Sequence, residues 1–246
     1  MPLPTRLLLA LAATVSLAAC GPGIDEAKRT TGSSSDPQVR LVNVADDKPS
    51  LNLYATDTVV QSGVALNAAG AYGTVAAGSV SLNVRAPGST TQLSAVTTTL
   101  ASGNHAAVVA STTGSTFAST LVTEDESNPD RGKAKLRVIN LASTEAGALD
   151  LFIAASCTGP ASSDTATLLN INGVSSYIQV TPPSTATHLC VTKAGTRSDL
   201  RLDVASVTLS DQRIVTLILV RAAATNSTLV KGLTLDQQTA LTILSP

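Results

Sequence analysis

The chain has 246 residues, of which 43% are hydrophobic and only 13% are charged, and its formal net charge is −1 at pH 7. This composition excludes a chain kept disordered by charge, and the near-neutral balance excludes a general surface for nucleic acids or other polyanions. Aromatic residues make up 2% and tryptophan is absent, so most of the platforms that stack on sugars or single-stranded nucleic acid are missing. The length fits one large or two ordinary domains.

The first 19 residues have the features of a secretory signal peptide. Arg6 supplies a positive charge, and an apolar run follows over residues 7–15. The run has about half of the roughly 20 residues needed to span a bilayer, which favours a cleaved signal over a membrane anchor. Residues 17–20 (Leu-Ala-Ala-Cys) resemble the bacterial lipobox. The resemblance implies cleavage after residue 19 and lipidation of Cys20; the alternative is an ordinary secretory signal with an incidental cysteine.

Residues 20–37 are expected to form a flexible tether, because they are rich in Gly, Ser and charged residues and have no apolar period. Residue 21 is Gly rather than the Asp that often retains such lipoproteins in the inner membrane. The lipobox resemblance therefore implies an exported protein held at the outer membrane by acyl chains on Cys20. The membrane is the partner predicted at this end of the chain.

The two halves of the rest of the chain share a series of short segments in the same order. The matching pairs are 39–45 with 136–142, 51–54 with 149–152, 72–75 with 177–180, 81–84 with 188–191, and 98–100 with 207–209. The offset grows by about a dozen residues, as expected when insertions fall in surface loops. The repeat predicts two modules, 38–122 and 134–246, joined by a polar linker over 123–133. Because this linker is short, the modules are expected to pack against each other.

Apolar and polar residues alternate over residues 80–85 and 200–204, which predicts half-buried strands with Leu200, Leu202 and Val204 on one face. Residues 214–220 are almost continuously apolar, which fits a strand buried on both faces. Turn signals recur at the spacing of a sandwich, at residues 86–88, 102–104 and 210–212. The predicted fold class is all-β, with two tandem antiparallel β-sandwich modules behind the signal peptide and the flexible linker.

These segments resemble the bacterial secreted modules of the domain of unknown function 4397. The hallmark of that family is a first strand ending in Asn or His, then a polar turn and a strand of the type Val-Asp-Val-Tyr. Asn43 and Asn140 end the two first strands, and residues 51–54 (LNLY) and 149–152 (LDLF) follow. The resemblance implies an immunoglobulin-like sandwich and little about activity; the family's proline-rich turn is reduced to Pro49. An Asn at a strand end usually bonds its own turn backbone.

Cys157 and Cys190 remain once Cys20 carries lipid, and an even pair in an oxidising compartment favours a disulfide. The bond would close a loop of about 33 residues and stabilise the fold by about 3–4 kcal/mol. The alternatives are two buried thiols, or a metal pair with His188, for which the sequence offers no evident fourth ligand. No metal and no cofactor are predicted.

Catalytic constellations are scarce in the sequence. His105 and His188 are the only histidines, and neither lies near a nucleophile elbow. His188 is expected on the solvent face of a strand. The acidic runs 46–47 and 124–126 follow no known calcium-loop pattern, so we interpret them as solvated turns.

The leading hypothesis is a non-enzymatic lipoprotein of the cell envelope, a surface or periplasmic module for binding, adhesion or scaffolding whose ligand and binding residues are unknown. An envelope protein or a glycan is the expected partner, and nucleic acid is not. One alternative is an unrecognised hydrolase, which would need a cleft between the modules with His105 or His188 beside a carboxylate. The other is a carbohydrate-binding module that uses the few aromatic residues, Tyr54, Tyr72, Phe117, Phe152 and Tyr177.

Overall fold

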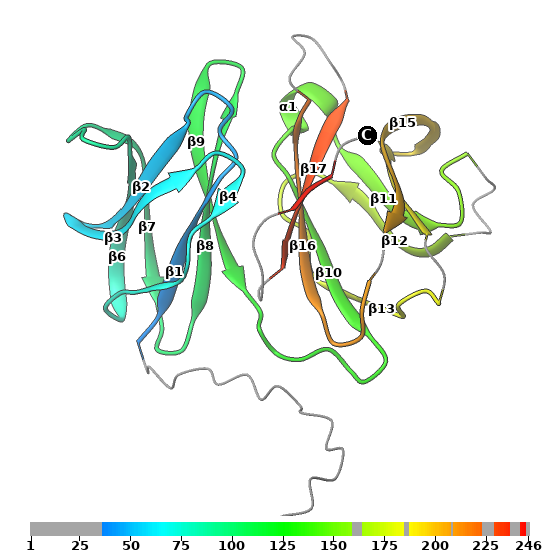
Figure 1. Ribbon diagram of the computed structural model, residues 1–246, viewed down its shortest axis with the longest axis horizontal. Helices are drawn as coiled ribbons and strands as arrows, with labels where there is room; N and C mark the ends of the chain where they lie inside the picture. Colours follow the sequence, from blue (N-terminus) through cyan, green and yellow to red (C-terminus); the bar gives the residue numbers. More distant parts are fainter. Residues whose placement is uncertain are drawn as a thin grey trace, which may run out of the picture. The chain divides into compact units, whose positions relative to one another are not determined.

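The structure is a computed structural model that describes residues 36–158, 164–184, 187–207, 209–222, 229–236 and 242–244. The expected signal peptide, Cys20 and nearly all of the expected tether lie outside these residues. Residues Ser34–Pro246 form one compact unit. Strands dominate the described part, and its only helix is the four-residue α1 (Ser143–Ala146), so the predicted all-β class is confirmed (Figure 1).

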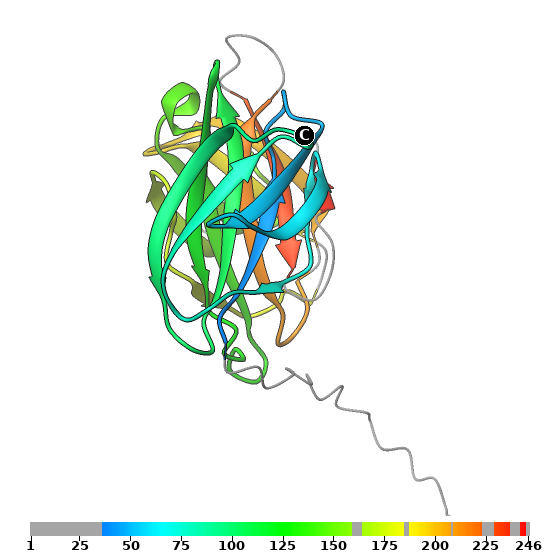
Figure 2. The same ribbon diagram turned by 90° about the vertical axis from the view of Figure 1, so that its left-hand side faces the viewer.

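The strands of the first half form two sheets. The β1 sheet has the order β4-β1-β8-β9, with β5 also paired to β1; its strands are β1 (Gln38–Asn43), β4 (Ala68–Ala69), β5 (Gly73–Thr74), β8 (His105–Thr113) and β9 (Thr116–Glu124). The β2 sheet has the order β3-β2-β6-β7; its strands are β2 (Ser50–Ala55), β3 (Thr58–Ala65), β6 (Gly78–Arg85) and β7 (Gln92–Leu100). Figure 2 shows the β2 sheet in front.

The second half repeats this arrangement. The β10 sheet has the order β13-β10-β16-β17-β18; its strands are β10 (Ala134–Asn140), β13 (Ile178–Val180), β16 (Ile214–Arg221), β17 (Val230–Asp236) and β18 (Thr242–Leu244). The β11 sheet has the order β12-β11-β14-β15; its strands are β11 (Leu149–Ala154), β12 (Asp164–Ile171), β14 (Thr187–Lys193) and β15 (Thr196–Val207).

Each half contains a parallel strand pair, where the sequence predicted a purely antiparallel sandwich. Strand β1 pairs in parallel with β8, and β10 pairs in the same way with β16. The partners are far apart in sequence, with Gln38 opposite His105 and Lys135 opposite Ile214. A parallel pair needs a long crossover, and here the strands of the opposite sheet provide it.

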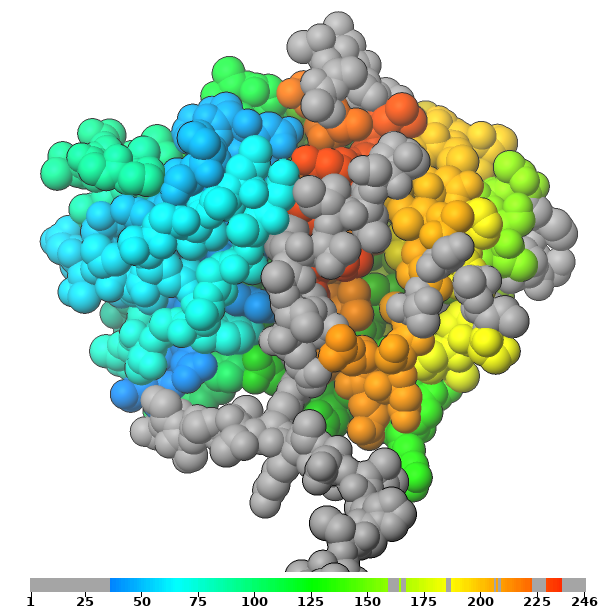
Figure 3. Space-filling view, in the orientation of Figure 1, coloured from blue at the N-terminus to red at the C-terminus, as the bar shows by residue number. Residues whose placement is uncertain are grey.

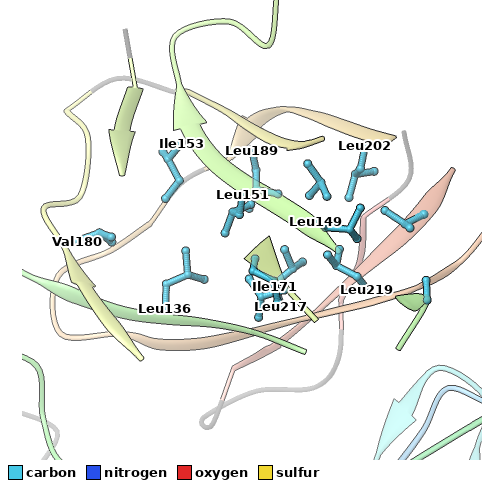
Figure 4. Packing of buried hydrophobic residues seen from close by; sticks show 14 of the residues in the cluster. Leu136, Leu149, Leu151, Ile153, Ile171, Val180, Leu189, Leu202, Leu217 and Leu219 are labelled. Atoms are coloured by element: carbon cyan, nitrogen blue, oxygen red, sulfur yellow. The ribbon is translucent and has the colours of Figure 1, made fainter. Parts of the chain in front are cut away.

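Each half has its own hydrophobic core between its two sheets. In the second half, Leu136 and Leu217 of the β10 sheet pack against Leu151, Leu189 and Leu202 of the β11 sheet (Figure 4). The first half has the same kind of core, which includes Leu41, Leu53, Leu82 and Val108. These side chains come from alternate positions along their strands, as the sequence pattern predicted.

A third cluster, here called the intermodule cluster, contains residues from both halves: Val42, Val44, Ala107, Val109, Val122, Ile139, Ile218, Val220, Leu233 and Leu235. Strand β16 therefore contributes Leu217 and Leu219 to the core and Ile218 and Val220 to the intermodule cluster. The prediction of a strand buried on both faces is confirmed for residues 214–220. The packing of the two halves that the short linker predicted is present too.

One strand departs from the predicted alternation. Leu202 and Val204 contact the core of the second half, but Leu200 packs on the opposite face of the β11 sheet, beside Phe152 and Cys190. The cause is a β-bulge, because Val191 pairs with Leu202 whereas the next residue of β14 pairs with Leu200. One extra residue in β15 reverses the face of everything beyond it.

Asn43 and Asn140 make the same set of hydrogen bonds in the two halves. The amide nitrogen of Asn140 donates to the carbonyls of Gly147 (3.0 Å) and Ile171 (2.9 Å), and its oxygen accepts from the backbone of Ala142 (3.1 Å). Asn43 makes the equivalent bonds, to the carbonyls of Lys48 and Val64 and from the backbone of Ala45. Both side chains are buried. The repeated asparagine therefore fixes the turn after the first strand.

Asn140→Ala is expected to lower the free energy of unfolding by about 2–3 kcal/mol, because two buried carbonyls lose their donor. Chemical denaturation of the purified chain measures the loss. The matched control is Asn128→Ala, at an exposed position, for which we expect a change within about 0.5 kcal/mol. Equal stability of the two variants would contradict the structural role of Asn140.

Candidate functional site

Polar side chains gather at two places in the described structure. One, here called the buried group, lies beside the intermodule cluster; its Arg40, Glu124 and Arg137 are buried, and its Tyr72 and Tyr177 are half-buried. The other lies on the outer face of the β11 sheet, opposite its core face, and contains the two cysteines of the second half. Figure 3 shows part of the second half, in yellow and orange, at the surface of the molecule.

The buried group is built on an ion pair between Arg40 and Glu124. Arg40 Nη2 lies 2.5 Å from Glu124 Oε1, with the two side chains 5% and 0% exposed. The Tyr72 hydroxyl donates to the other carboxylate oxygen, and the Arg40 guanidinium lies 4.6 Å from the Tyr72 ring centre. Burial and the charge of Glu124 raise the pKa of Tyr72 far above its ordinary value, so Tyr72 stays a neutral donor.

Arg137 repeats this stacking in the second half and links the two halves. Its guanidinium lies 4.5 Å from the Tyr177 ring centre, and its Nε donates to Thr216 Oγ1 at 2.9 Å. Its Nη1 donates to the backbone carbonyl of Thr123 in the first half at 2.8 Å. Burial lowers the pKa of Arg137 and raises that of Tyr177. Because Arg40, Glu124 and Arg137 are buried and Arg137 bonds the first half at Thr123, we assign this group to the joint between the halves.

The acidic run 124–126 is engaged with basic side chains, and not the solvated turn that the sequence predicted. Glu124 is the last residue of β9 and is buried. Glu126 Oε2 lies 2.5 Å from His105 Nδ1. Lys135 bonds Asp125 at 2.8 Å and, with Ser127, lowers the pKa of Asp125 to about 2. The sequence missed these partners because most of them lie far along the chain.

The outer face of the β11 sheet carries a small apolar cluster around the two cysteines. Their sulfurs are bonded at 2.10 Å, with the Cα atoms 5.4 Å apart. Cys190 projects from β14 and Cys157 follows the end of β11, and both are buried with Phe152 and Ala154. The structure thus joins the two residues that cysteine counting paired.

His188 stands beside the disulfide. Its Nδ1 lies 2.7 Å from Asp203 Oδ1, and the two side chains are 32% and 37% exposed. One ligand atom each of Cys157, His188 and Asp203 lies within 4.8 Å of the others. The sequence predicted a solvent-facing His188, with a metal pair to the cysteines as an alternative, and missed Asp203. Asp203 could have been found only from the strand register, because it lies opposite Cys190 where β14 pairs with β15.

Both histidines therefore meet one condition of the hydrolase alternative, a carboxylate partner. At His188 the neighbouring sulfur of Cys157 is bonded to Cys190 and is not a free thiol. The ring of His105 lies 4.9 Å from that of Tyr72. Each histidine is thus paired with a carboxylate, His105 with Glu126 and His188 with Asp203.

A pocket of about 380 Å³ opens next to the disulfide, and it is lined by Cys157, Thr158, Arg197, Ser198 and Leu200. Arg197 is held by two contacts to Asp164, at 2.7 and 2.9 Å, and its guanidinium lies 4.5 Å from the Phe152 ring centre. The first half has a counterpart, in which Arg85 lies 4.3 Å from the Tyr54 ring centre and 3.0 Å from Asp57.

All of the aromatic residues of the chain have a cationic side chain over the ring: Tyr54 (Arg85), Tyr72 (Arg40), Phe117 (Lys48), Phe152 (Arg197) and Tyr177 (Arg137). The ring centre lies 4.3 to 6.0 Å from the cation in these pairs. A sugar that stacked on one of these faces would have to displace the cation. On each ring, one face is therefore taken by a cation.

Residues 37–152 match the family described as Domain of unknown function (DUF4397), a match that spans the first half and ends at Phe152 in β11. The solved family 41 carbohydrate-binding modules from streptococcal virulence factors, which recognise α-glucan, show 12% identity and a TM-score of 0.25 over 73% of this chain and 93% of that chain. The family 26 module CBMbc from Eubacterium rectale Amy13K, in complex with maltoheptaose, shows 11% identity and a TM-score of 0.25 over 86% and 98%.

No curated protein matches the chain. Among the described residues, no helix has the length and apolar character needed to cross a membrane.

Proposed function

We propose that the chain is a non-enzymatic lipoprotein of the bacterial cell envelope, whose two modules of the DUF4397 type form one binding head on a lipidated tether. The observation that carries the binding role is the pocket beside the disulfide. Its volume of about 380 Å³ lies within the range typical of small-molecule sites, about 300–1,000 Å³. The head takes its ligand on the outer face of the β11 sheet.

The pocket combines a fixed polar group with an apolar floor. Arg197 is oriented by Asp164 and by the Phe152 ring, so its direction is set before a ligand arrives. Thr158 and Ser198 add hydroxyl groups, and Leu200 adds apolar surface. This lining suits a small, hydroxyl-rich ligand held by hydrogen bonds and not by aromatic stacking.

The remaining part of the proposal is the anchor. The lipobox and the tether would hold the head on the outer membrane, at a distance set by residues 20–37. Cys20→Ser is expected to abolish incorporation of labelled fatty acid and to release the protein from the membrane fraction. Labelling that persists in this variant would contradict the lipoprotein assignment.

Ligand binding is tested with a broad glycan and metabolite screen on the purified protein. A ligand of the pocket is expected to lose at least tenfold in affinity in Arg197→Ala, because the fixed donor is removed. The matched control is Arg85→Ala, which removes the equivalent guanidinium from the first half and leaves the pocket intact. A ligand that binds both variants equally well would place the binding site elsewhere, and a screen without any ligand would speak for scaffolding or adhesion.

A further inference from the structure

The two cysteines of the disulfide and two neighbouring side chains have the chemistry of metal ligands. The cysteines cannot bind a metal while they are bonded to each other. We propose that after reduction of the disulfide Cys157, Cys190, His188 and Asp203 bind one divalent cation of the zinc class. The sequence offered two cysteines and a histidine but no fourth ligand. The structure supplies it in Asp203, which lies with Cys157 and His188 in a group whose ligand atoms are within 4.8 Å of one another.

The backbone brings the four residues together on one face of one sheet. His188 and Cys190 are alternate residues of β14, so their side chains project to the same side. Asp203 lies opposite Cys190 on β15, and Cys157 reaches the same point from the end of β11. Three of the four ligands thus come from paired strands, which hold ligand positions more rigidly than loops do.

The chemical types fit zinc. Two thiolates, an imidazole and a carboxylate are ligands that Zn²⁺ takes in tetrahedral sites. With zinc–sulfur bonds of about 2.3 Å and zinc–nitrogen bonds of about 2.0 Å, neighbouring ligand atoms lie about 3.3–3.8 Å apart. The ligand atoms of His188, Asp203 and Cys157 lie within 4.8 Å of one another, so side-chain movements of about 1 Å bring them to that range.

The disulfide and the metal exclude each other. The sulfurs now lie 2.10 Å apart, and a bonded pair has no thiolate to offer a metal. A dithiol reductant opens the site by giving two electrons and two protons to the disulfide, which becomes two thiols while the reductant becomes a disulfide. The metal then displaces one proton from each thiol into solvent.

The site also has an entry path. The cysteines are buried, at 4% and 1% exposure, and the outer pair of ligands reaches solvent, with side-chain exposures of 32% for His188 and 37% for Asp203. A hydrated cation therefore meets the imidazole and the carboxylate first and the sulfurs last. The two arginines of β15 have other carboxylate partners, Arg197 with Asp164 and Arg201 with Asp199.

Cobalt(II) is the probe of choice, because tetrahedral thiolate coordination gives it visible d–d bands and a near-ultraviolet charge-transfer band. The exported full-length protein, free of any polyhistidine tag, is reduced with dithiothreitol, freed of reductant without oxygen, and titrated with Co²⁺ and then Zn²⁺. We expect both bands to reach their maximum at one cobalt per chain, and zinc to abolish them. The oxidised protein should give neither band. Reduced protein without these bands would overturn the proposal.

Variants separate the full site from a pair of free thiols. His188→Ala and Asp203→Asn are each expected to weaken cobalt binding by about tenfold or more, as loss of a ligand or of its support does in known sites. The matched control is His105→Ala, the other histidine with a carboxylate partner, which should bind as the unchanged protein does. Unchanged affinity in both site variants would overturn the four-ligand assignment. Circular dichroism of each reduced protein verifies its fold, and zinc protection of the wild-type thiols from alkylation tests the site without any variant.

Discussion

Glu124→Gln is expected to lower the free energy of unfolding by about 3–5 kcal/mol, which is the range measured when one partner of a buried ion pair is removed. The carboxylate is wholly enclosed and its partner Arg40 is 5% exposed in its side chain, so the substitution leaves a guanidinium charge without an anion or water. It also weakens the bond from Tyr72. Urea denaturation followed by circular dichroism measures the loss.

The control for this substitution is Asp57→Asn. Asp57 also pairs with an arginine, Arg85, but its side chain is 86% exposed, so water replaces the lost contact and we expect at most about 1 kcal/mol. Replacing both members of the buried pair, as Arg40→Met with Glu124→Leu, should recover most of the stability lost in Glu124→Gln. A loss no larger than that of the control would show that the pair is not buried in solution.

Cys157→Ala together with Cys190→Ala is expected to cost about 3–4 kcal/mol, because the bond closes a 33-residue loop and its loss restores freedom to the unfolded chain. Guanidinium denaturation under non-reducing conditions measures the difference. Reduced wild-type protein without metal should show a similar loss. A double variant as stable as the oxidised wild type would indicate that the loop is ordered without the bond.

Local pattern explains which features could be predicted from the sequence. The repeat and the period of two identified most strands and the doubly buried residues 214–220, because alternation and continuous apolarity are visible within a few positions. Asn43 and Asn140 were interpreted correctly as turn-bonding residues, since the turn they bond begins only two residues later. Setting Cys20 aside for lipid favoured a Cys157–Cys190 disulfide over two buried thiols or a metal pair, and the structure has the bond.

The features that were missed depend on register and on distant partners. Glu124 sits in a polar run that looks solvated, and its partner Arg40 lies 84 residues away. Asp203 became visible as a neighbour of the cysteines only through its pairing with Cys190. Leu200 was assigned to the wrong face because a single bulge in β15 is not encoded in the alternation. The parallel pairing of β1 with β8 was also missed, because it depends on the path of the chain between the two strands and not on the pattern of either strand.

The position of β8 between two apolar layers has a consequence for how this chain evolves. Ala106 and Ala110 face the core of the first half, whereas Ala107 and Val109 face the intermodule cluster. A larger side chain at any of these positions would clash either with the core of the first half or with the intermodule cluster. Either half on its own would expose its apolar side of the intermodule cluster to solvent. The two halves are therefore expected to occur together in one gene, and neither half is expected to be exchanged alone between genes.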